Sequence, residues 1–204
     1  MIKKLKPEIV FTGWGEISAF LSPLIPFFSK TKFITRETNV VSKHVTRKEI
    51  LFFYRFYTNF HQIIAQSDDM KKDLIENFKI NPSRISKINN PVDFEMINEL
   101  KDEIIEQDYN KSYKKIVSIG NLSQRKGFDL LLNVFQYLKN EPIKLTIFGD
   151  GRDKAELLQQ KSDLQLENVS FFGKVNNPFP FVKQADLFIL SSRYEGFPNV
   201  LLEA

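Results

Sequence analysis

Glycines and charged side chains gather in three short segments of the second half of the sequence, each directly after a run that predicts a parallel strand. These segments are 120–127, 149–151 and 191–198. Parallel strands end at the same edge of a sheet, so the three segments should lie together there. A diphosphate bound at that edge needs cations and free backbone amides, which Arg125, Lys126 and a helix beginning near Pro198 could supply. Proline is favoured at the first helical position, which supports a helix start there.

The elements that must position these segments alternate along the second half of the chain. The patterns predict four strands, at 115–119, 143–148, 169–171 and 186–190, and two helices, at 127–139 and 152–160. The first helix is supported by apolar residues at helical spacing, which are Phe128, Leu131, Leu132, Phe135 and Leu138. This alternation predicts half of a Rossmann-like domain, whose ligands bind where the carboxyl ends of the strands meet the loops.

The first half of the sequence shows the same alternation with three shorter strand-like runs, at 8–12, 32–35 and 62–66. The third run leads into Ser67, which we expect to cap a helix, and Asp68 and Asp69 would then lie favourably in its first turn. A strand, a cap and a helix in this order form a building block of doubly wound folds. The fold class is therefore α/β with parallel sheets.

Pro91 breaks the pattern between the two halves. It removes a backbone donor and pushes Asn90 toward an extended conformation. A charged stretch follows it. We therefore expect two domains, at 1–90 and 115–204, joined by an interdomain crossing at 91–114.

Composition excludes several classes of site. The 204 residues include no cysteine, so a disulfide framework, a thiolate metal site and a cysteine nucleophile are excluded. His44 and His61 have no second ligand at zinc-like spacing, and no Asp-x-Asp pair follows a strand, so we expect no metal site. The net charge of +4 is modest and no nucleic-acid-binding module is present, so no nucleic-acid partner is expected. A nicotinamide fingerprint is absent, because Lys154 stands where the third glycine of Gly149-x-Gly151 would be.

The sequence carries no membrane-spanning or signal pattern. No apolar run approaches the roughly 20 residues that span a bilayer. The most apolar stretch, Ala19–Phe28, is interrupted by Pro23 and Pro26, and the basic start of the chain is not followed by the apolar core of a signal peptide. We therefore expect a cytoplasmic protein.

Two glutamates at the end of the sequence carry the most specific pattern. The segment Glu195-Gly-Phe-Pro-Asn-Val-Leu-Leu-Glu203 resembles the signature of retaining group 1 glycosyltransferases, in which seven residues separate the pair. The segments 185–192 and 118–129 are similar to the same family and occur in its order. The resemblance implies two Rossmann-like domains of GT-B type, both incomplete, with an acceptor-side domain at 1–90 and a nucleotide-sugar-binding domain at 115–204.

The resemblance also implies roles for individual residues. Glu203 would accept hydrogen bonds from the ribose hydroxyls of the donor. The amides around Gly196 and Phe197 and the side chain of Lys126 would face the donor diphosphate. Glu195 would lie near the transferred sugar and stabilise positive charge at its anomeric carbon. Preorganised cations and amides stabilise the negative charge that grows on the leaving diphosphate, so Glu195 and Lys126 are the catalytic candidates.

Four further residues complete the donor-binding set that the resemblance implies, and they are Asn121, Arg125, Gly149 and Asn199. The family commonly has arginine where this chain has Asn121, so one diphosphate cation is missing unless Arg125 substitutes for it. Structural alternatives stay open for the whole set. The cations could be solvated loop residues, the second glutamate an exposed helix residue, and Gly149 an ordinary turn glycine.

In the front half the resemblance is looser. Arg36 and Glu37 follow the strand at 32–35, where the family often places residues of the acceptor-side cleft, and an ion pair or a turn is the alternative. One helical face of the segment 46–61 holds four large residues, Ile50, Phe53, Tyr54 and Tyr57. With cations nearby, such a helix could approach anionic lipid or a lipid-linked acceptor, or it could pack inside the domain.

The function that these patterns favour is sugar transfer from a nucleotide diphosphate sugar, with UDP as the expected nucleotide, to a glycan or lipid-linked acceptor. The family implies retention of the anomeric configuration, and neither a cofactor nor an obligate metal is expected. A membrane surface is a candidate partner, which would place the protein peripherally at the inner face of the membrane. The alternative is a truncated, catalytically inactive fragment that binds nucleotide or a partner protein, because the family's glycine-rich N-terminal loop and its last donor-domain elements are not found.

Overall fold

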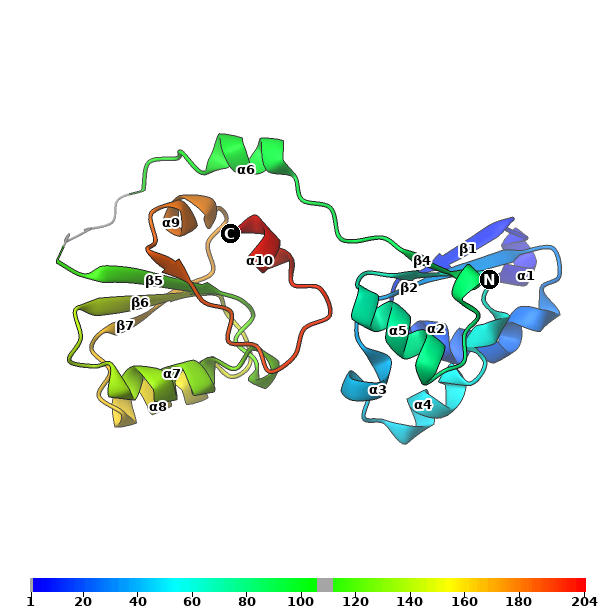
Figure 1. The fold of residues 1–204 in the computed structure, drawn as a ribbon, viewed down its shortest axis with the longest axis horizontal. Helices are drawn as coiled ribbons and strands as arrows, with labels where there is room; N and C mark the ends of the chain where they lie inside the picture. Colours follow the sequence, from blue (N-terminus) through cyan, green and yellow to red (C-terminus); the bar gives the residue numbers. More distant parts are fainter. Residues whose placement is uncertain (1, 106–111) are drawn as a thin grey trace. The chain divides into compact units, whose positions relative to one another are not determined.

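Two compact units make up the computed structural model, which describes residues 2–105 and 112–204. The first unit comprises Met1–Pro91 with Glu195–Phe197, and the second comprises Val92–Tyr194 with Pro198–Ala204. Each unit is built around a four-stranded sheet whose strands are all parallel (Figure 1).

The first sheet has the strand order β1-β2-β3-β4. Its strands are β1 (Ile9–Thr12), β2 (Lys32–Glu37), β3 (Gln62–Ala65) and β4 (Ile85–Lys87). The three expected strands are present. The sequence did not predict β4, because this strand has three residues and only Ile85 is buried, which leaves no alternation to detect.

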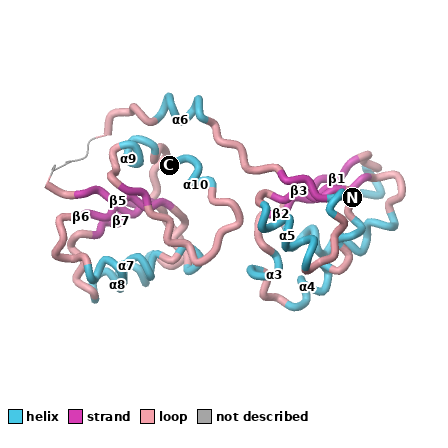
Figure 2. The backbone as a smooth tube through the Cα atoms, in the orientation of Figure 1, coloured by secondary structure: helices cyan, strands magenta, loops and turns pink. Residues whose placement is uncertain are grey.

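Short helices and 3₁₀ turns connect the strands of the first unit (Figure 2). The helices are α1 (Ile2–Leu5), α2 (Gly15–Leu21), α3 (Val41–His44), α4 (Lys48–Tyr54) and α5 (Asp68–Glu76). The 3₁₀ turns are Ser22–Phe27, Tyr57–Asn59 and Pro82–Arg84. In Figure 1, α3, α4 and α5 lie on the same side of the sheet, which places the core between them and the strands.

Helix α5 begins where its capping signal predicts. The Ser67 side chain accepts a hydrogen bond from the Met70 amide at 3.2 Å, and Asp68 and Asp69 occupy the first turn. The cap satisfies one of the amides that a helix start leaves without an intrahelical partner. Met70 and Leu74 are buried, so the same helix start also fixes which face of α5 meets the core.

Helix α4 packs inside the first unit. Ile50 and Tyr54 are each 1% exposed, and Tyr57, in the turn that follows, is fully buried. These are three of the four residues that the sequence offered as a face for lipid. That interpretation is wrong for this face, and the alternative of an internal helix is correct.

A buried carboxylate lies at the end of β2. Glu37 is 2% exposed, and it accepts hydrogen bonds from the hydroxyls of Tyr57 and Tyr54. Burial raises the pKa of Glu37 to about 7, the hydrogen bonds from the two tyrosines act in the opposite direction, and the charge of Asp73 adds to the rise. Burial, followed by the charge of Glu37, also raises the pKa values of Tyr54 and Tyr57.

The second sheet has the strand order β7-β6-β5-β8. Its strands are β5 (Lys114–Ile119), β6 (Ile143–Phe148), β7 (Val169–Gly173) and β8 (Leu187–Phe188). All four expected strands are present, but β8 is shorter than predicted. The Ile189 amide still donates to the Val117 carbonyl at 2.9 Å, whereas the Ile189 carbonyl accepts from the Ser118 hydroxyl at 2.7 Å, so a side chain takes over where the regular pairing ends.

Helices cover both faces of the second sheet (Figure 1). The helices of the second unit are α6 (Phe94–Leu100), α7 (Phe128–Tyr137), α8 (Lys154–Asp163), α9 (Phe179–Lys183) and α10 (Asn199–Glu203). Helices α7 and α8 lie on one face and α9 on the other. One hydrophobic cluster, which includes Leu131, Leu132, Phe135 and Leu157, lies under α7 and α8. A smaller cluster of Val117, Phe148 and Phe181 lies under α9.

Helix α6 lies within the segment that was expected to cross between domains. The Asp93 side chain caps it by accepting a hydrogen bond from the Met96 amide at 2.9 Å. Part of that segment, 106–111, lies outside the described residues.

We expect Glu37→Gln to remove a pH dependence from the stability of the first unit. The folded state holds the Glu37 proton up to about pH 7, whereas the unfolded chain releases it near 4.5, so wild-type stability falls as the pH rises between these values. The free energy of unfolding falls by roughly 3 kcal/mol, and this fall is complete above the folded-state pKa of Glu37. Urea unfolding near pH 5 and near pH 8, followed by the fluorescence of Trp14, the one tryptophan, measures it.

The matched control is Glu49→Gln, because Glu49 is exposed on α4. This variant should keep the pH dependence of the wild type. If Glu37→Gln also keeps it, burial of an ionisable carboxyl at this position does not limit the stability.

Candidate functional site

Three loops meet at the carboxyl edge of the second sheet, as the strand order requires. They follow β5, β6 and β8. The Leu122 amide, in the first loop, donates to the Asp150 carbonyl of the second loop at 2.9 Å. The Arg193 amide, in the third loop, donates to the Arg125 carbonyl of the first at 2.8 Å. The backbone itself therefore joins all three loops.

Two glycines allow this close approach. At Gly149 the backbone φ is +141°, and a side-chain carbon would lie 1.9 Å from the Gly120 carbonyl oxygen. At Gly127 φ is +65°, and a side-chain carbon would lie 2.1 Å from the Ser191 carbonyl oxygen. Both conformations favour glycine, and neither site has room for a larger residue. Loop packing thus explains Gly149 without a ligand.

An arginine–aspartate pair locks the third loop to the start of α7. The Arg193 Nη1 and Nη2 atoms donate to the Asp129 Oδ1 and Oδ2 atoms at 2.7 and 2.6 Å. The Arg193 hydrogen bonds hold the pKa of Asp129 below its usual range. Nη1 also donates to the Gln124 carbonyl at 2.6 Å. Sequence reasoning missed this pair, because no local pattern joins residues 64 positions apart.

The predicted cations lie in the loop after β5. The Lys126 Cδ and Cε carbons lie 3.5 Å from the point where a side chain would begin on Gly120, so the lysine stem crosses this loop. The Lys126 carbonyl accepts a hydrogen bond from the Ser191 hydroxyl at 2.9 Å. Arg125 is half-buried and Asn121 is exposed. These donor-side candidates thus share one edge of the sheet with Gly149.

The two-glutamate segment is divided between the units. Glu195, Gly196 and Phe197 belong to the first unit, and Phe197 packs against its core. Asn199 and Glu203 lie in the second unit on α10. The residue before this helix, Pro198, has an extended backbone conformation. The helix starts close to where the proline predicts, but Glu195 lies outside it, so the two glutamates do not share a helical face.

Arg36 and Glu37 point to opposite sides of β2. Burial alternates along this strand, and Glu37 faces the core. The Arg36 guanidinium lies beside Gly13, with Nη2 3.6 Å from the point where a side chain would begin on that glycine. No ion pair among the described residues joins Arg36 to Glu37, so the structural alternative of a pair between them does not apply.

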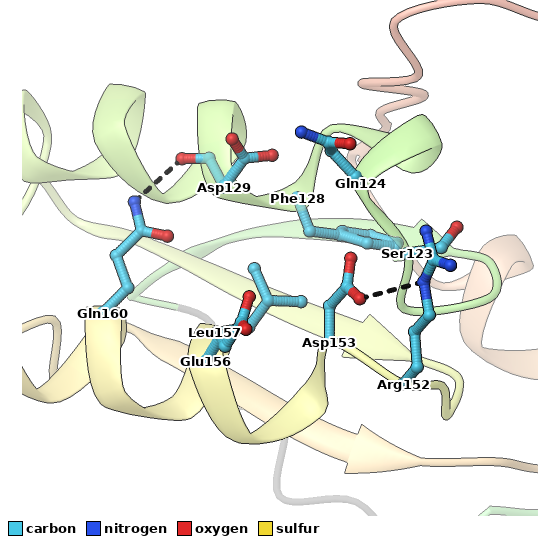
Figure 3. Close-up of a pocket in the computed structure, with 9 residues that line it drawn as sticks. All are labelled: Ser123, Gln124, Phe128, Asp129, Arg152, Asp153, Glu156, Leu157 and Gln160. Atoms are coloured by element: carbon cyan, nitrogen blue, oxygen red, sulfur yellow. Dashed lines mark hydrogen bonds and ion pairs between the residues drawn. The ribbon is translucent and has the colours of Figure 1, made fainter.

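A cavity of about 350 Å³ lies beside the loops, between α7 and α8 (Figure 3). Its lining includes the carboxylates of Asp129, Asp153 and Glu156. One cation, Arg152, is also present, and it pairs with Asp153 at 3.2 Å. The Asp129 carbonyl accepts a hydrogen bond from Gln160 at 3.0 Å across the cavity. The excess of carboxylates disfavours a phosphate ligand here.

Residues 2–105 and 112–204 contain no group of three or more histidine, cysteine, aspartate or glutamate side chains that could hold a metal ion. None of the helices in these ranges combines the length and apolar character needed to cross a membrane.

A known family matches the half of the chain that contains the three loops. Residues 101–204 match the family described as Glycosyl transferases group 1. The chain belongs to this family. Its membership confirms the resemblance drawn from the two-glutamate segment and from the loop and strand that precede it.

Curated relatives extend the match into the first half. An uncharacterised glycosyltransferase of Methanocaldococcus jannaschii is 29% identical, over 100% of this chain and 54% of its own length. The N-acetylgalactosamine-N,N'-diacetylbacillosaminyl-diphospho-undecaprenol 4-alpha-N-acetylgalactosaminyltransferase of Campylobacter jejuni is 34% identical, over 97% of this chain and 54% of its own length. The chain thus spans about half the length of these relatives.

Solved structures of other proteins share the fold. Anabaena HepE in complex with UDP and glucose has a TM-score of 0.77 at 19% identity, over 97% of this chain and 56% of its own. Sucrose-phosphate synthase from Thermosynechococcus elongatus has a TM-score of 0.78 at 14% identity, over 99% of this chain and 54% of its own. These likenesses confirm the α/β fold of GT-B type.

We expect Gly149→Ala to destabilise the second unit much more than Gly173→Ala. Both glycines have positive φ, at +141° and +91°. Backbone strain for alanine at such positions costs on the order of 1–3 kcal/mol. Only at Gly149 does the new carbon meet an atom, the Gly120 carbonyl oxygen at 1.9 Å, whereas nothing lies within 4 Å at Gly173. Urea unfolding followed by circular dichroism should show an extra loss of about 2 kcal/mol or more for Gly149→Ala.

Trp14 fluorescence serves as the internal control in both variants, because this residue lies in the first unit. The transition that it reports should not move. Equal losses for the two substitutions would show that the loops do not pack as closely as described.

Proposed function

We propose that this chain is part of a retaining glycosyltransferase that takes a sugar from a nucleotide diphosphate sugar, with UDP as the nucleotide, and transfers it to a glycan or lipid-linked acceptor. The observation that carries the proposal is the convergence of three loops at the carboxyl edge of the second sheet in a member of this family. HepE, which shares the fold, has been solved with UDP and with UDP-glucose. This supports UDP as the nucleotide.

Binding of a diphosphate is the chemistry that suits this edge. Arg125 and Lys126 place two cations in the loop after β5, and α7 begins two residues later at Phe128. The start of a helix carries partial positive charge, so it favours the same anion as the two side chains. Arg193 is already neutralised by Asp129, so its role is to hold the loop and not to bind phosphate.

The proposed roles of the remaining residues follow the family resemblance. Glu203 accepts hydrogen bonds from the ribose hydroxyls, with Asn199 on the same short helix. Gly196 and Phe197 provide amides for the diphosphate, and Glu195 orients the transferred sugar. Of the two acceptor-side candidates, only Arg36 can contact the acceptor, because the buried Glu37 faces the core.

The reaction exchanges one bond to the anomeric carbon for another. The bond to the diphosphate oxygen breaks and the acceptor oxygen bonds to the same face of the sugar, while the proton of the acceptor hydroxyl passes to the departing diphosphate. Negative charge grows on the departing diphosphate as this happens. Lys126 then stabilises the transition state more than the bound donor, which is the requirement for catalysis.

A place at the inner face of the membrane is part of this proposal. The name of the Campylobacter relative includes a diphospho-undecaprenol-linked glycan. The α2 helix and the 3₁₀ turn after it expose four apolar side chains, Ile17, Phe20, Leu24 and Phe27, at 58, 46, 50 and 76%. Residues 1–60 hold ten Lys and Arg against four Asp and Glu, a net charge of +6. An apolar stripe on a basic unit suits an anionic lipid surface.

We expect this chain to bind UDP in calorimetric titration and to bind GDP and ADP much more weakly. Lys126→Met should lower the affinity for UDP by about 10–100-fold, because a hydrogen bond to a charged group contributes about 1.5–3 kcal/mol. Lys139→Met is the matched control, since Lys139 follows α7 at the opposite end of that helix. It should bind UDP as the wild type does.

If no nucleotide binds, the donor-site assignment is wrong. Binding of UDP without turnover of a UDP-sugar, even by a donor hydrolysis assay, would favour the alternative of an inactive nucleotide-binding fragment. Transfer with inversion of the anomeric centre, seen by proton NMR of the product, would contradict the retaining mechanism.

We also expect the chain to float with vesicles that contain phosphatidylglycerol and not with vesicles of phosphatidylcholine alone. Leu24→Ser combined with Phe27→Ser should abolish flotation, because it removes half of the exposed stripe. Phe94→Ser is the control, since Phe94 is 67% exposed in the second unit. Equal flotation of all three proteins would exclude the stripe as the lipid contact.

A further inference from the structure

Arg36 carries a buried hydrogen-bond donor that has no partner in the part of the chain that the structure describes. It lies near the end of β2, at the carboxyl edge of the first sheet, in register with Ile64 of β3. Its Nε atom is buried, and it has no hydrogen-bond partner among the described residues. None of the ion pairs found within residues 2–105 and 112–204 includes its guanidinium.

Such a donor is uncommon in a folded protein. Buried polar groups almost always have a hydrogen-bond partner, and an unpaired one points to strain, a water molecule, an ion or a ligand. The cost is highest for a charged group, which gives up strong hydration when it is buried. The guanidinium has five donors in one plane, so an oxyanion can accept from Nε and from a terminal nitrogen together. Arg36 therefore lacks an acceptor of that kind.

Two glycines bring the loop after β1 against the end of β2. A side-chain carbon at Gly13 would lie 3.6 Å from the Arg36 Nη2 atom and 3.8 Å from Nε, so bare backbone borders the guanidinium. On the other side of Trp14, a side-chain carbon at Gly15 would lie 3.2 Å from the Glu37 carboxylate. The loop thus rests on both residues, and Trp14 lies between the two contacts with its side chain 70% exposed.

Glu37, next to Arg36 in the sequence, and Glu16, which follows the loop after β1, are both engaged elsewhere. The Glu37 carboxylate is turned to the core, where Tyr57 donates to it. Glu16, in the first turn of α2, pairs with Arg47 at 3.8 Å. Neither pairs with Arg36, which leaves its half-buried guanidinium open to an anionic ligand.

We infer that the Arg36 guanidinium binds a phosphate group of the acceptor, namely the diphosphate of a lipid-linked glycan. The inference rests on the proposed function, which supplies such an acceptor. A guanidinium matches the geometry of phosphate oxygens better than an ammonium does, because two parallel N–H groups contact two oxygens. The net charge of +6 over residues 1–60 attracts an anion to the same unit. The ligand then supplies the acceptor that the buried Nε lacks.

Titration with geranyl diphosphate tests the inference, with inorganic diphosphate and geraniol as parallel ligands. Saturating UDP is present throughout, so that the donor edge is occupied. Calorimetry gives the affinity, and the fluorescence of Trp14 places the binding next to Gly13. We expect both diphosphates to bind and geraniol not to bind. Tighter binding of geranyl diphosphate identifies a lipid-linked source, equal binding shows that the diphosphate alone is recognised, and binding of neither overturns the inference.

Variants assign the binding to Arg36. Arg36→Met keeps the length of the side chain without the charge and should weaken geranyl diphosphate binding at least tenfold. Arg55→Met should not change it, because Arg55 is exposed and lies 5.7 Å from the Phe52 ring. The methyl group of Gly13→Ala would lie at ordinary contact distance from the guanidinium, so this variant should still bind geranyl diphosphate. The branches of Gly13→Val should displace the guanidinium and weaken that binding. Wild-type affinity in Arg36→Met overturns the inference.

Binding of UDP to the same samples separates this inference from the proposed function. Arg36→Met should bind UDP as the wild type does. If UDP binds and geranyl diphosphate does not, the acceptor inference fails and the donor site stands. If UDP fails to bind, the proposed function fails whatever the role of Arg36.

Discussion

Close contact between backbones at the carboxyl edge of the second sheet is the constraint on which the rest of that unit depends. The carbonyl oxygens of Gly120 and Ser191 lie where side chains would begin on Gly149 and Gly127. Because nothing larger than hydrogen fits there, the loops after β5, β6 and β8 cannot separate without losing this packing. The same packing sets Lys126 at the start of α7, where a cation and a helix start act on one anion.

Charge is used in two different ways in the two units. At the second sheet, Arg193 forms an ion pair with Asp129, and this pair holds a loop in place rather than binding a ligand. At the first sheet, Glu37 lies in the core against two tyrosines, and its neighbour Arg36 has a buried donor that finds no partner among the described residues. Neighbouring residues of one strand thus lie in different environments, one in the core and one open to a ligand, because alternate side chains of a strand face opposite sides.

Local signals were enough to predict most of the fold. Ser67 and the acidic turn after it gave the start of α5, and alternating strands and helices gave parallel sheets. What depends on distant contacts could not be predicted. Tyr54 and Tyr57 are buried beside Glu37, and no local pattern reveals these contacts because the residues lie 17 and 20 positions apart. The assignment of Glu195 to the first unit likewise depends on tertiary contacts, although its sequence motif is specific.

The carboxyl edge of the second sheet is the proposed binding site of the donor diphosphate. Amide chemical shifts of the isotope-labelled chain during addition of UDP would locate that site. We expect the largest shifts at Gly120, Lys126 and Gly149, which lie in the converging loops. Shifts confined to Glu156 and Gln160, which line the cavity between α7 and α8, would contradict the claim.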